Sequence, residues 1–314
     1  MPVGNKPLVQ HALEDLIGAG IRDVAVVTSP HLADEVDEIV SETAGDGVTA
    51  TSVVSEGPVF AEALQGVAPF LGTEPFVVHL GDSLNQGGLS SVLDDLPARQ
   101  NDVLALVEPS RQDVIPVGAG LASLRTAGVY VFGPGALELA GELEAPNDWD
   151  LQIAAAADRL AAAGGRVELR PVRDWWRYRD RPDALLQANR FFLSGIRASG
   201  PADAWLENTD LQGPVVVHPS ARIISSTVRG PVIIGPGAEI RDAYIGPYTS
   251  IGSGVVIENA EVEHSIILQG ASIKHLGGRL EASVVGAEAR IFRDFRLPRA
   301  LRLNVGNRAE VAVT

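Results

Sequence analysis

Apolar and polar residues follow two different patterns along the chain, and the first predicts strands and helices in turn. Short apolar runs bounded by Gly, Pro or Asp predict strands, and apolar residues three and four apart predict helices. We expect strands at 23–28, 48–54, 76–80, 102–107 and 166–172, and helices at 8–20, 30–43, 60–71, 149–163 and 182–196. Residues 121–132 read as a strand pair broken near Gly128, and 89–96 as a helix. This alternation favours a doubly wound, mostly parallel α/β sheet.

From about Val217 onward the pattern becomes a repeat with a period of seventeen residues. Aliphatic residues recur at steps of six, five and six in three series: Val217, Ile234, Ile251, Leu268 and Val285; Ile223, Ile240 and Ile257; Val228, Ile245 and Val262. Three short faces per coil, each with one inward aliphatic side chain, describe a parallel β-helix of hexapeptide repeats. The second and third series break at Lys274 and Arg279, where apolar residues are expected, which indicates an interruption or a longer corner.

The two patterns meet at Ser199-Gly200-Pro201, a small-residue break typical of a linker. We therefore expect an α/β domain over residues 1–198 and a β-helix domain over 210–314. Exposed coil ends need cover, which predicts self-association or assembly with a relative.

Composition and charge narrow the class of protein. The net charge of −15 argues against a nucleic-acid partner, because phosphate backbones need clustered Lys and Arg. No run approaches the ~18 apolar residues that span a bilayer, so we expect no membrane segment. The chain has no cysteine, which excludes disulfides and thiolate metal sites and fits a cytoplasmic location.

The strand that ends on Leu80-Gly81-Asp82 carries the first candidate site. Ligands of open α/β sheets bind beyond the carboxyl ends of the strands, so Asp82 is expected to face a ligand. Gly81 permits a tight turn, and a carboxylate is an oxygen ligand suited to Mg²⁺ beside a phosphate. The alternative is that Gly-Asp-Ser only closes the strand, since all three residues favour turns.

A series of motifs in chain order extends this interpretation to nearly the whole sequence. They are Pro2–Pro7 (PVGNKP), Leu80-Gly81-Asp82, Gly128-Val129-Tyr130, Trp175-Trp176, Leu185–Arg190 and Arg229–Ile240 with the coils after it. Together they resemble the long form of the sugar-1-phosphate nucleotidyltransferase family, of the glucose-1-phosphate thymidylyltransferase type. The resemblance implies a Rossmann-like nucleotidyltransferase domain followed by a left-handed β-helix. It also implies a reaction in which a sugar 1-phosphate attacks a nucleoside triphosphate, Mg²⁺ assists and pyrophosphate leaves.

The resemblance assigns substrate and metal positions to particular residues. Asp82 matches one of the two metal carboxylates of the family, but the position of the other holds Tyr178. Leu80, Gly81 and Gly128 match substrate-binding positions. Asp150 falls near the family's sugar-binding Glu and is one methylene shorter.

Other positions depart from the family pattern. The Gln and Gly that contact the base fall on Val54 and Val59. The Lys that holds the sugar phosphate has no counterpart between Val107 and Gly128. The first strand, the Gly-rich loop and the catalytic Lys of the family would lie upstream of Met1, and Lys6 matches only the second lysine of that region.

Two explanations compete for these departures. A start codon placed too late would remove the loop and the Lys together, leaving an active nucleotidyltransferase with missing N-terminal residues. It would not account for Tyr178, Val54 or Val59. We therefore expect a catalytically degenerate protein with a binding, scaffold or regulatory role. It would bind a sugar phosphate or nucleotide sugar, and would use Mg²⁺ only if nucleotide binding or activity remains.

A third hypothesis is an acyltransferase that uses the β-helix. A coil histidine would then act as general base between subunits. The candidates are His218, His264 and His275, each of which also reads as an ordinary surface or corner residue.

Overall fold

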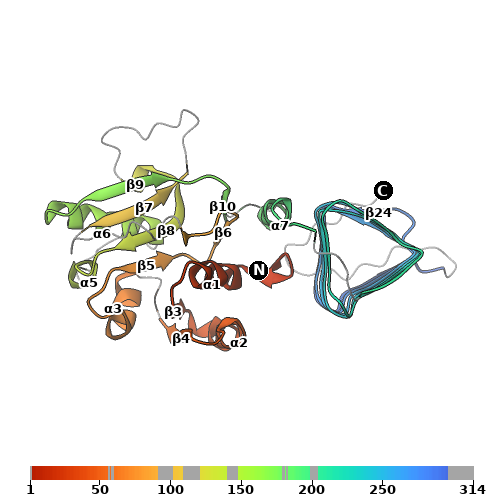
Figure 1. The fold of residues 1–314 in the computed structure, drawn as a ribbon, viewed down its shortest axis with the longest axis horizontal. Helices are drawn as coiled ribbons and strands as arrows, with labels where there is room; N and C mark the ends of the chain where they lie inside the picture. Colours follow the sequence, from red (N-terminus) through yellow and green to blue (C-terminus); the bar gives the residue numbers. More distant parts are fainter. Residues whose placement is uncertain are drawn as a thin grey trace. The chain divides into compact units, whose positions relative to one another are not determined.

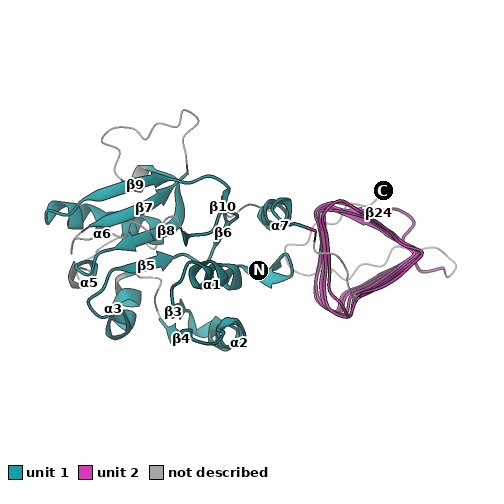
Figure 2. Cartoon of the chain, in the orientation of Figure 1, with its two compact units in different colours: residues 1–197 teal, residues 198–314 magenta. Residues whose placement is uncertain are grey.

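The protein is seen in a computed structural model that describes residues 2–55, 57, 60–90, 102–108, 121–139, 148–178, 181, 183–198 and 204–295. The chain divides into two compact units, residues 1–197 and 198–314 (Figure 2). None of the described helices has the length and apolar character needed to cross a membrane.

Unit 1 contains a four-stranded mixed sheet and a separate two-stranded parallel sheet (Figure 1). The four-stranded sheet has the order β5 (Phe76–His79), β8 (Thr126–Phe132), β7 (Val103–Val107) and β9 (Val167–Pro171). The smaller sheet pairs β3 (Asp23–Thr28) with β4 (Thr49–Val54). Two short antiparallel pairs complete the strands: β1 (Pro2–Val3) with β2 (Lys6–Pro7), and β6 (Ser83–Asn85) with β10 (Trp175–Arg177).

Helices cover both faces of the four-stranded sheet because its strands carry apolar side chains on both sides. On β8, Tyr130 and Phe132 pack into one core with the helices α3 and α6, whereas Val129 and Val131 pack into another with α1 and α2. The helices are α1 (Leu8–Gly18), α2 (Ala33–Thr43), α3 (Phe60–Leu71), α5 (Ala136–Leu139), α6 (Trp149–Ala162) and α7 (Ala184–Ser194), with 3₁₀ turns at Pro30–Leu32 and Leu121–Ser123.

The α/β domain expected from the sequence is confirmed, with differences in one sheet. The expectation of a strand pair at 121–132 was wrong, because a 3₁₀ turn precedes a single strand there. That strand, β8, is antiparallel to both β5 and β7, so the sheet is mixed and not mostly parallel. An apolar run reads alike in either direction, so the sequence pattern carried no sign of this reversal. Most of the helix expected at 89–96 lies outside the described residues.

Unit 2 is a parallel β-solenoid of about five turns with three sheets, seen nearly end-on in Figure 1. The first sheet holds β11 (Trp205–Glu207), β14 (Arg222–Ile224), β17 (Glu239–Arg241), β20 (Val256–Glu258), β23 (Ser272–Lys274) and β26 (Arg290–Phe292). The second holds β12 (Asp210–Gln212), β15 (Thr227–Arg229), β18 (Tyr244–Ile245), β21 (Glu261–Glu263) and β24 (Arg279–Glu281). The third holds β13 (Val215–Val217), β16 (Val232–Ile234), β19 (Thr249–Ile251), β22 (Ile266–Ile267) and β25 (Val284–Val285).

The expected β-helix is confirmed, but its later coils depart from a uniform period of seventeen. The register between β19 and β22 advances by sixteen residues, and that between β21 and β24 by eighteen. The inward positions are therefore taken by Ile267, Ile273 and Leu280. The uniform period had placed Leu268, Lys274 and Arg279 at these positions. The assignment of Leu268 was wrong, and the longer corner that Lys274 and Arg279 indicated is confirmed, since residues 275–278 separate β23 from β24. The apparent interruption is a one-residue deletion followed by a longer corner, and the apolar column continues.

Candidate functional site

The candidate site lies where the four-stranded sheet meets the β6–β10 pair. β5 ends at His79, and the turn Leu80-Gly81-Asp82 leads directly into β6. β6 pairs with β10 so that Ser83 faces Arg177, and the Tyr178 N–H donates to the Asp82 carbonyl oxygen at 2.7 Å. Positions 82 and 178, which are far apart in the sequence, are thus brought together by the backbone.

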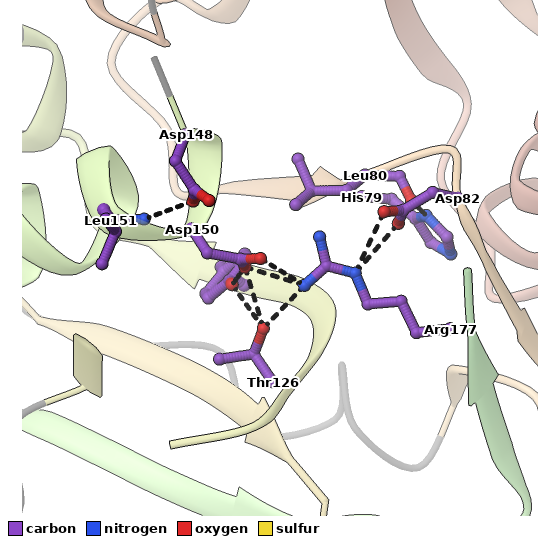
Figure 3. A network of polar contacts seen from close by, with 9 residues as sticks. His79, Leu80, Asp82, Thr126, Asp148, Asp150, Leu151 and Arg177 are labelled. Atoms are coloured by element: carbon purple, nitrogen blue, oxygen red, sulfur yellow. Dashed lines mark hydrogen bonds and ion pairs between the residues drawn. The ribbon is translucent and has the colours of Figure 1, made fainter. Parts of the chain in front are cut away.

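Arg177 occupies the centre of this site and binds two carboxylates at once (Figure 3). Its Nε donates to both oxygens of Asp82, each at 3.1 Å. Its Nη1 donates to both oxygens of Asp150, each at 2.8 Å. The Arg177 side chain is only 10% exposed, whereas those of Asp82 and Asp150 are 37% and 40% exposed. One guanidinium therefore lies beneath and between two acids that reach solvent.

Two hydroxyl groups from β8 hold the second carboxylate in place. Thr126 Oγ1 donates to Asp150 Oδ1 at 3.0 Å and accepts from Arg177 Nη1 at 3.0 Å. The Tyr130 hydroxyl donates to the same Asp150 oxygen at 2.7 Å. Asp150 itself lies in the first turn of α6, where an acidic side chain is favoured by the helix dipole. The carboxylate is thus fixed by four hydrogen bonds from three side chains.

Gly128 makes room for the guanidinium. Its φ of +79° is in the left-handed region that other residues avoid. A Cβ at this position would lie 3.2 Å from Arg177 Nε and 3.4 Å from Asp82 Oδ1. A larger residue would therefore crowd Arg177 and come into contact with Asp82.

Burial and the charge of Arg177 shift the pKa values of the two carboxylates in opposite directions. Burial raises the pKa of Asp82, and the charge and hydrogen bonds of Arg177 limit that rise. Burial also acts to raise the pKa of Asp150, but the hydrogen bonds and charge of Arg177 outweigh it and hold that pKa below its usual value. The two carboxylates hold the pKa of Arg177 above its usual value, so the cation is permanent.

Comparison with known proteins identifies the kind of domain that carries this site. Residues 1–115 match the family described as nucleotidyl transferase. The chain is 29% identical to the glucose-1-phosphate thymidylyltransferase of Streptomyces griseus, over 100% of this chain and 93% of that protein. It is 30% identical to the glucose-1-phosphate thymidylyltransferase of Streptomyces antibioticus, over 99% and 92% respectively. The chain belongs to the sugar-1-phosphate nucleotidyltransferase family.

A solved structure supports the fold of the nucleotidyltransferase unit. It is a putative glucose-1-phosphate thymidylyltransferase from Bacillus anthracis in complex with a sucrose, with a TM-score of 0.51 and 18% identity. The similarity covers 64% of this chain and 87% of that one. At this identity the likeness concerns the fold alone.

The residues of the site do not fit the Mg²⁺ that the family implies. Mg²⁺ needs octahedral oxygen ligands, and Asp82 would have to supply one while both of its oxygens accept hydrogen bonds from Arg177. Position 178, where the family carries the second carboxylate, is a half-buried Tyr. Among the described residues no three His, Cys, Asp or Glu side chains cluster in a way that could hold a metal ion.

The structure brings together most of the residues that the sequence singled out in this family member. Asp82, Gly128 and Asp150 converge on Arg177, and Leu80 and Gly81 form the adjoining turn. Of the two Val residues at base-contact positions, Val54 is 50% exposed on β4, and Val59 lies outside the described residues.

Sequence reasoning missed the members of the site that contribute nitrogen and hydroxyl groups. The sequence assigned no role to Arg177 or Thr126, and Tyr130 entered only as the last residue of the Gly128-Val129-Tyr130 motif. The sequence offered no local signal for Arg177, because its place beside Asp82 depends on the pairing of β10 with β6. Each coil histidine has a neighbour in its own chain: His218 bonds Ser220, His264 lies against Tyr248 and His275 approaches Asn259. The role of a coil histidine between subunits stays a prediction.

His79, next to the site, predicts a loss of stability in acid. Burial lowers the pKa of His79 to about 4, below the ~6.5 of an unfolded histidine, and its Nε2 has no partner among the described residues. The stability that the neutral ring supports is present above pH 6.5 and is lost as the pH falls toward 4. Over that window His79 is expected to add up to ~1.4 kcal/mol per pH unit to the fall in the free energy of unfolding.

Urea unfolding followed by tryptophan fluorescence measures this contribution. In a Trp205→Phe background the three remaining tryptophans, Trp149, Trp175 and Trp176, all lie in unit 1. His79→Phe should flatten the profile between pH 6.5 and 4, whereas replacement of the exposed His31 by Phe should leave it unchanged. Equal profiles for the His79→Phe variant and the parent would contradict the assignment.

Proposed function

We propose that this member of the sugar-1-phosphate nucleotidyltransferase family binds a sugar or a nucleotide sugar without transferring a nucleotidyl group. It then acts as a binding, scaffold or regulatory subunit, alone or assembled with an active relative. The observation that carries the proposal is the double ion pair of Arg177 with Asp82 and Asp150. Nucleotidyl transfer needs charge at the α-phosphorus to be neutralised by a metal and by cations aimed at it.

The side chains of the site favour hydroxyl groups over a metal-bound triphosphate. Its formal charge is −1, from two carboxylates and one guanidinium, which disfavours a bare phosphate. The two carboxylates are each more than a third exposed, and they can accept hydrogen bonds from sugar hydroxyls. Arg177 Nη2, which has no bond to the described residues, can donate to a ring or hydroxyl oxygen. A guanidinium donor beside two carboxylate acceptors can bind adjacent hydroxyl groups of a sugar.

An assay for pyrophosphate release tests the absence of turnover. With dTTP, glucose 1-phosphate and Mg²⁺, the protein should release no pyrophosphate above the rate without enzyme. Losing one preorganised charge donor typically costs 10²- to 10³-fold in rate, and here both oxygens of Asp82 already accept hydrogen bonds from Arg177. Sustained, stoichiometric formation of dTDP-glucose by the chain with Arg177 intact would reject the proposal and favour an active nucleotidyltransferase, which the 30% identity to curated thymidylyltransferases supports.

Thermal unfolding tests retention of a ligand. A ligand that binds only the folded protein raises the midpoint as its concentration exceeds the dissociation constant. We expect dTDP-glucose to raise the midpoint for the parent, and Asp150→Asn to reduce that rise at least tenfold in apparent affinity. The matched control is Asp148→Asn, two residues earlier, which keeps the oxygen that caps α6 through Leu151 N. No rise for the parent, or equal rises for both variants, would contradict binding at this site.

A further inference from the structure

A polar groove lies on one face of the solenoid, apart from the Arg177 site. It encloses about 760 Å³, within the usual size range of small-molecule sites. Its floor is the sheet of β15, β18 and β21, from which Thr227, Tyr244 and Glu261 project outward. We propose that this groove binds a neutral, hydroxyl-rich ligand, a short oligosaccharide.

An enlarged corner closes one end of the groove. The corners that precede β15, β18 and β21 have two residues each, as in Asn259-Ala260, whereas the corner before β24 has four, residues 275–278. Leu276 packs against the solenoid core, and Gly277 and Gly278 line the groove. The two extra residues of this corner, set against the one-residue deletion, also produce the eighteen-residue advance between β21 and β24. The corner that departs from the repeat therefore also forms the wall of the groove.

The wall is held in place by Arg279. Its Nε donates to Glu261 at 3.1 Å, its Nη1 donates to Glu263 at 2.7 Å, and its guanidinium lies 5.2 Å from the centre of the Tyr244 ring. The ion pairs with Glu261 and Glu263 neutralise the charge of Arg279, so it is not available to an anionic ligand. The remaining charged groups that line the groove are Arg229 and Asp242, which balance each other.

Several polar groups that line the groove have no protein partner. Among the described residues, the carboxylate of Asp242 and the hydroxyls of Thr227 and Tyr244 make no hydrogen bond, and Arg229 bonds only through Nε, to Gln212. Asp242 and Asn259 stand one above the other at corners with φ of +48° and +47°. The Asp242 carboxylate, the Tyr244 hydroxyl and the guanidinium of Arg229 provide the acceptors and donors that sugar hydroxyls need. A balanced lining gives no preference for an anion.

Saturation-transfer NMR on the full chain tests the proposal with four neutral trisaccharides: maltotriose, cellotriose, mannotriose and triacetylchitotriose. At least one should bind, and Tyr244→Ala and Asp242→Asn should each weaken it tenfold or more. Arg241→Ala, an exposed residue of the neighbouring sheet, is the matched control and should bind like the parent. Deleting Gly277 and Gly278 restores the two-residue corner used elsewhere and should abolish binding while circular dichroism remains unchanged.

The outcomes separate this site from the one around Arg177. Binding that survives Arg177→Leu and is lost in the groove variants supports the inference, whether or not the proposed function holds. Binding by none of the trisaccharides, binding lost only in Arg177→Leu, or displacement by inorganic phosphate would overturn it. A dimer by sedimentation that Tyr244→Ala dissociates, without trisaccharide binding, would instead make the groove a contact between copies of the chain.

Discussion

Arg177→Leu is expected to lower the free energy of unfolding of the nucleotidyltransferase unit by about 2–4 kcal/mol at pH 7. Removing one partner of a buried ion pair costs about 3–5 kcal/mol, because the remaining charge is left desolvated. Here Asp82 and Asp150 keep 37% and 40% of their side chains in solvent, which reduces that figure. The change also leaves two carboxylates facing each other without the cation between them. Urea unfolding in the Trp205→Phe background measures the loss.

Arg125→Leu is the matched control for this prediction. Arg125 pairs with Glu108 at 2.7 Å, but its side chain is 65% exposed. Exposed pairs contribute about 0–1 kcal/mol, so this variant should be close to the parent. Adding Asp82→Asn and Asp150→Asn to Arg177→Leu should recover part of the stability, since the unpaired charges are then removed. Similar losses for Arg177→Leu and Arg125→Leu, or no recovery in the triple variant, would show that Arg177 is not the electrostatic centre of the site.

The acidic half of this site could be predicted from the sequence, but the basic half could not. Asp82 follows a buried strand, and the carboxyl end of such a strand is where ligands bind. Asp150 and Gly128 came from the family resemblance. Arg177 had no such signal, because a single Arg in a short strand reads as a solvent-facing residue. Only the antiparallel pairing of β10 with β6 places Arg177 opposite Ser83. A pairing between segments so far apart in the sequence leaves no local pattern in either segment.

The order and direction of the strands could not be predicted from the sequence for a related reason. Apolar periodicity identified β5 and β7 and placed strand residues in the region of β8, because buried strands need apolar side chains. Burial does not depend on strand direction. The direction of β8 is set by its long-range contacts with β5 and β7, and these leave no local pattern. The ends of the other expected strands and helices agree with the structure to within a few residues, since spacings of two, or of three and four, are local properties of one segment.

In the solenoid, the sequence identified the repeat because every coil buries an aliphatic side chain at the same place. A strict period of seventeen does not follow the change in coil length after β19. It therefore selects Leu268, Lys274 and Arg279, each of which is next to the true inward residue. In the first case the period selects Leu268, whereas β22 pairs Ile267 with Ile251. Ile267 is fully buried in the solenoid core, and Leu268 is half-buried outside β22.

Ile267→Ala is therefore expected to destabilise the neighbouring coils by about 2–4 kcal/mol, and Leu268→Ala by about 1 kcal/mol or less. Truncating a buried Ile loses its transfer free energy and leaves a cavity, whereas a half-buried side chain loses much less. Coils of a solenoid contact only their neighbours, so the loss should concentrate around β19, β22 and β25. Hydrogen exchange followed by mass spectrometry measures it as reduced protection of amides in 249–285, with residues 205–217 as an internal reference. If Leu268→Ala opened these coils more than Ile267→Ala, the shortened coil would be wrong and the uniform period correct. The enlarged corner at 275–278 would then have to be reassigned as well, because the two register changes compensate each other.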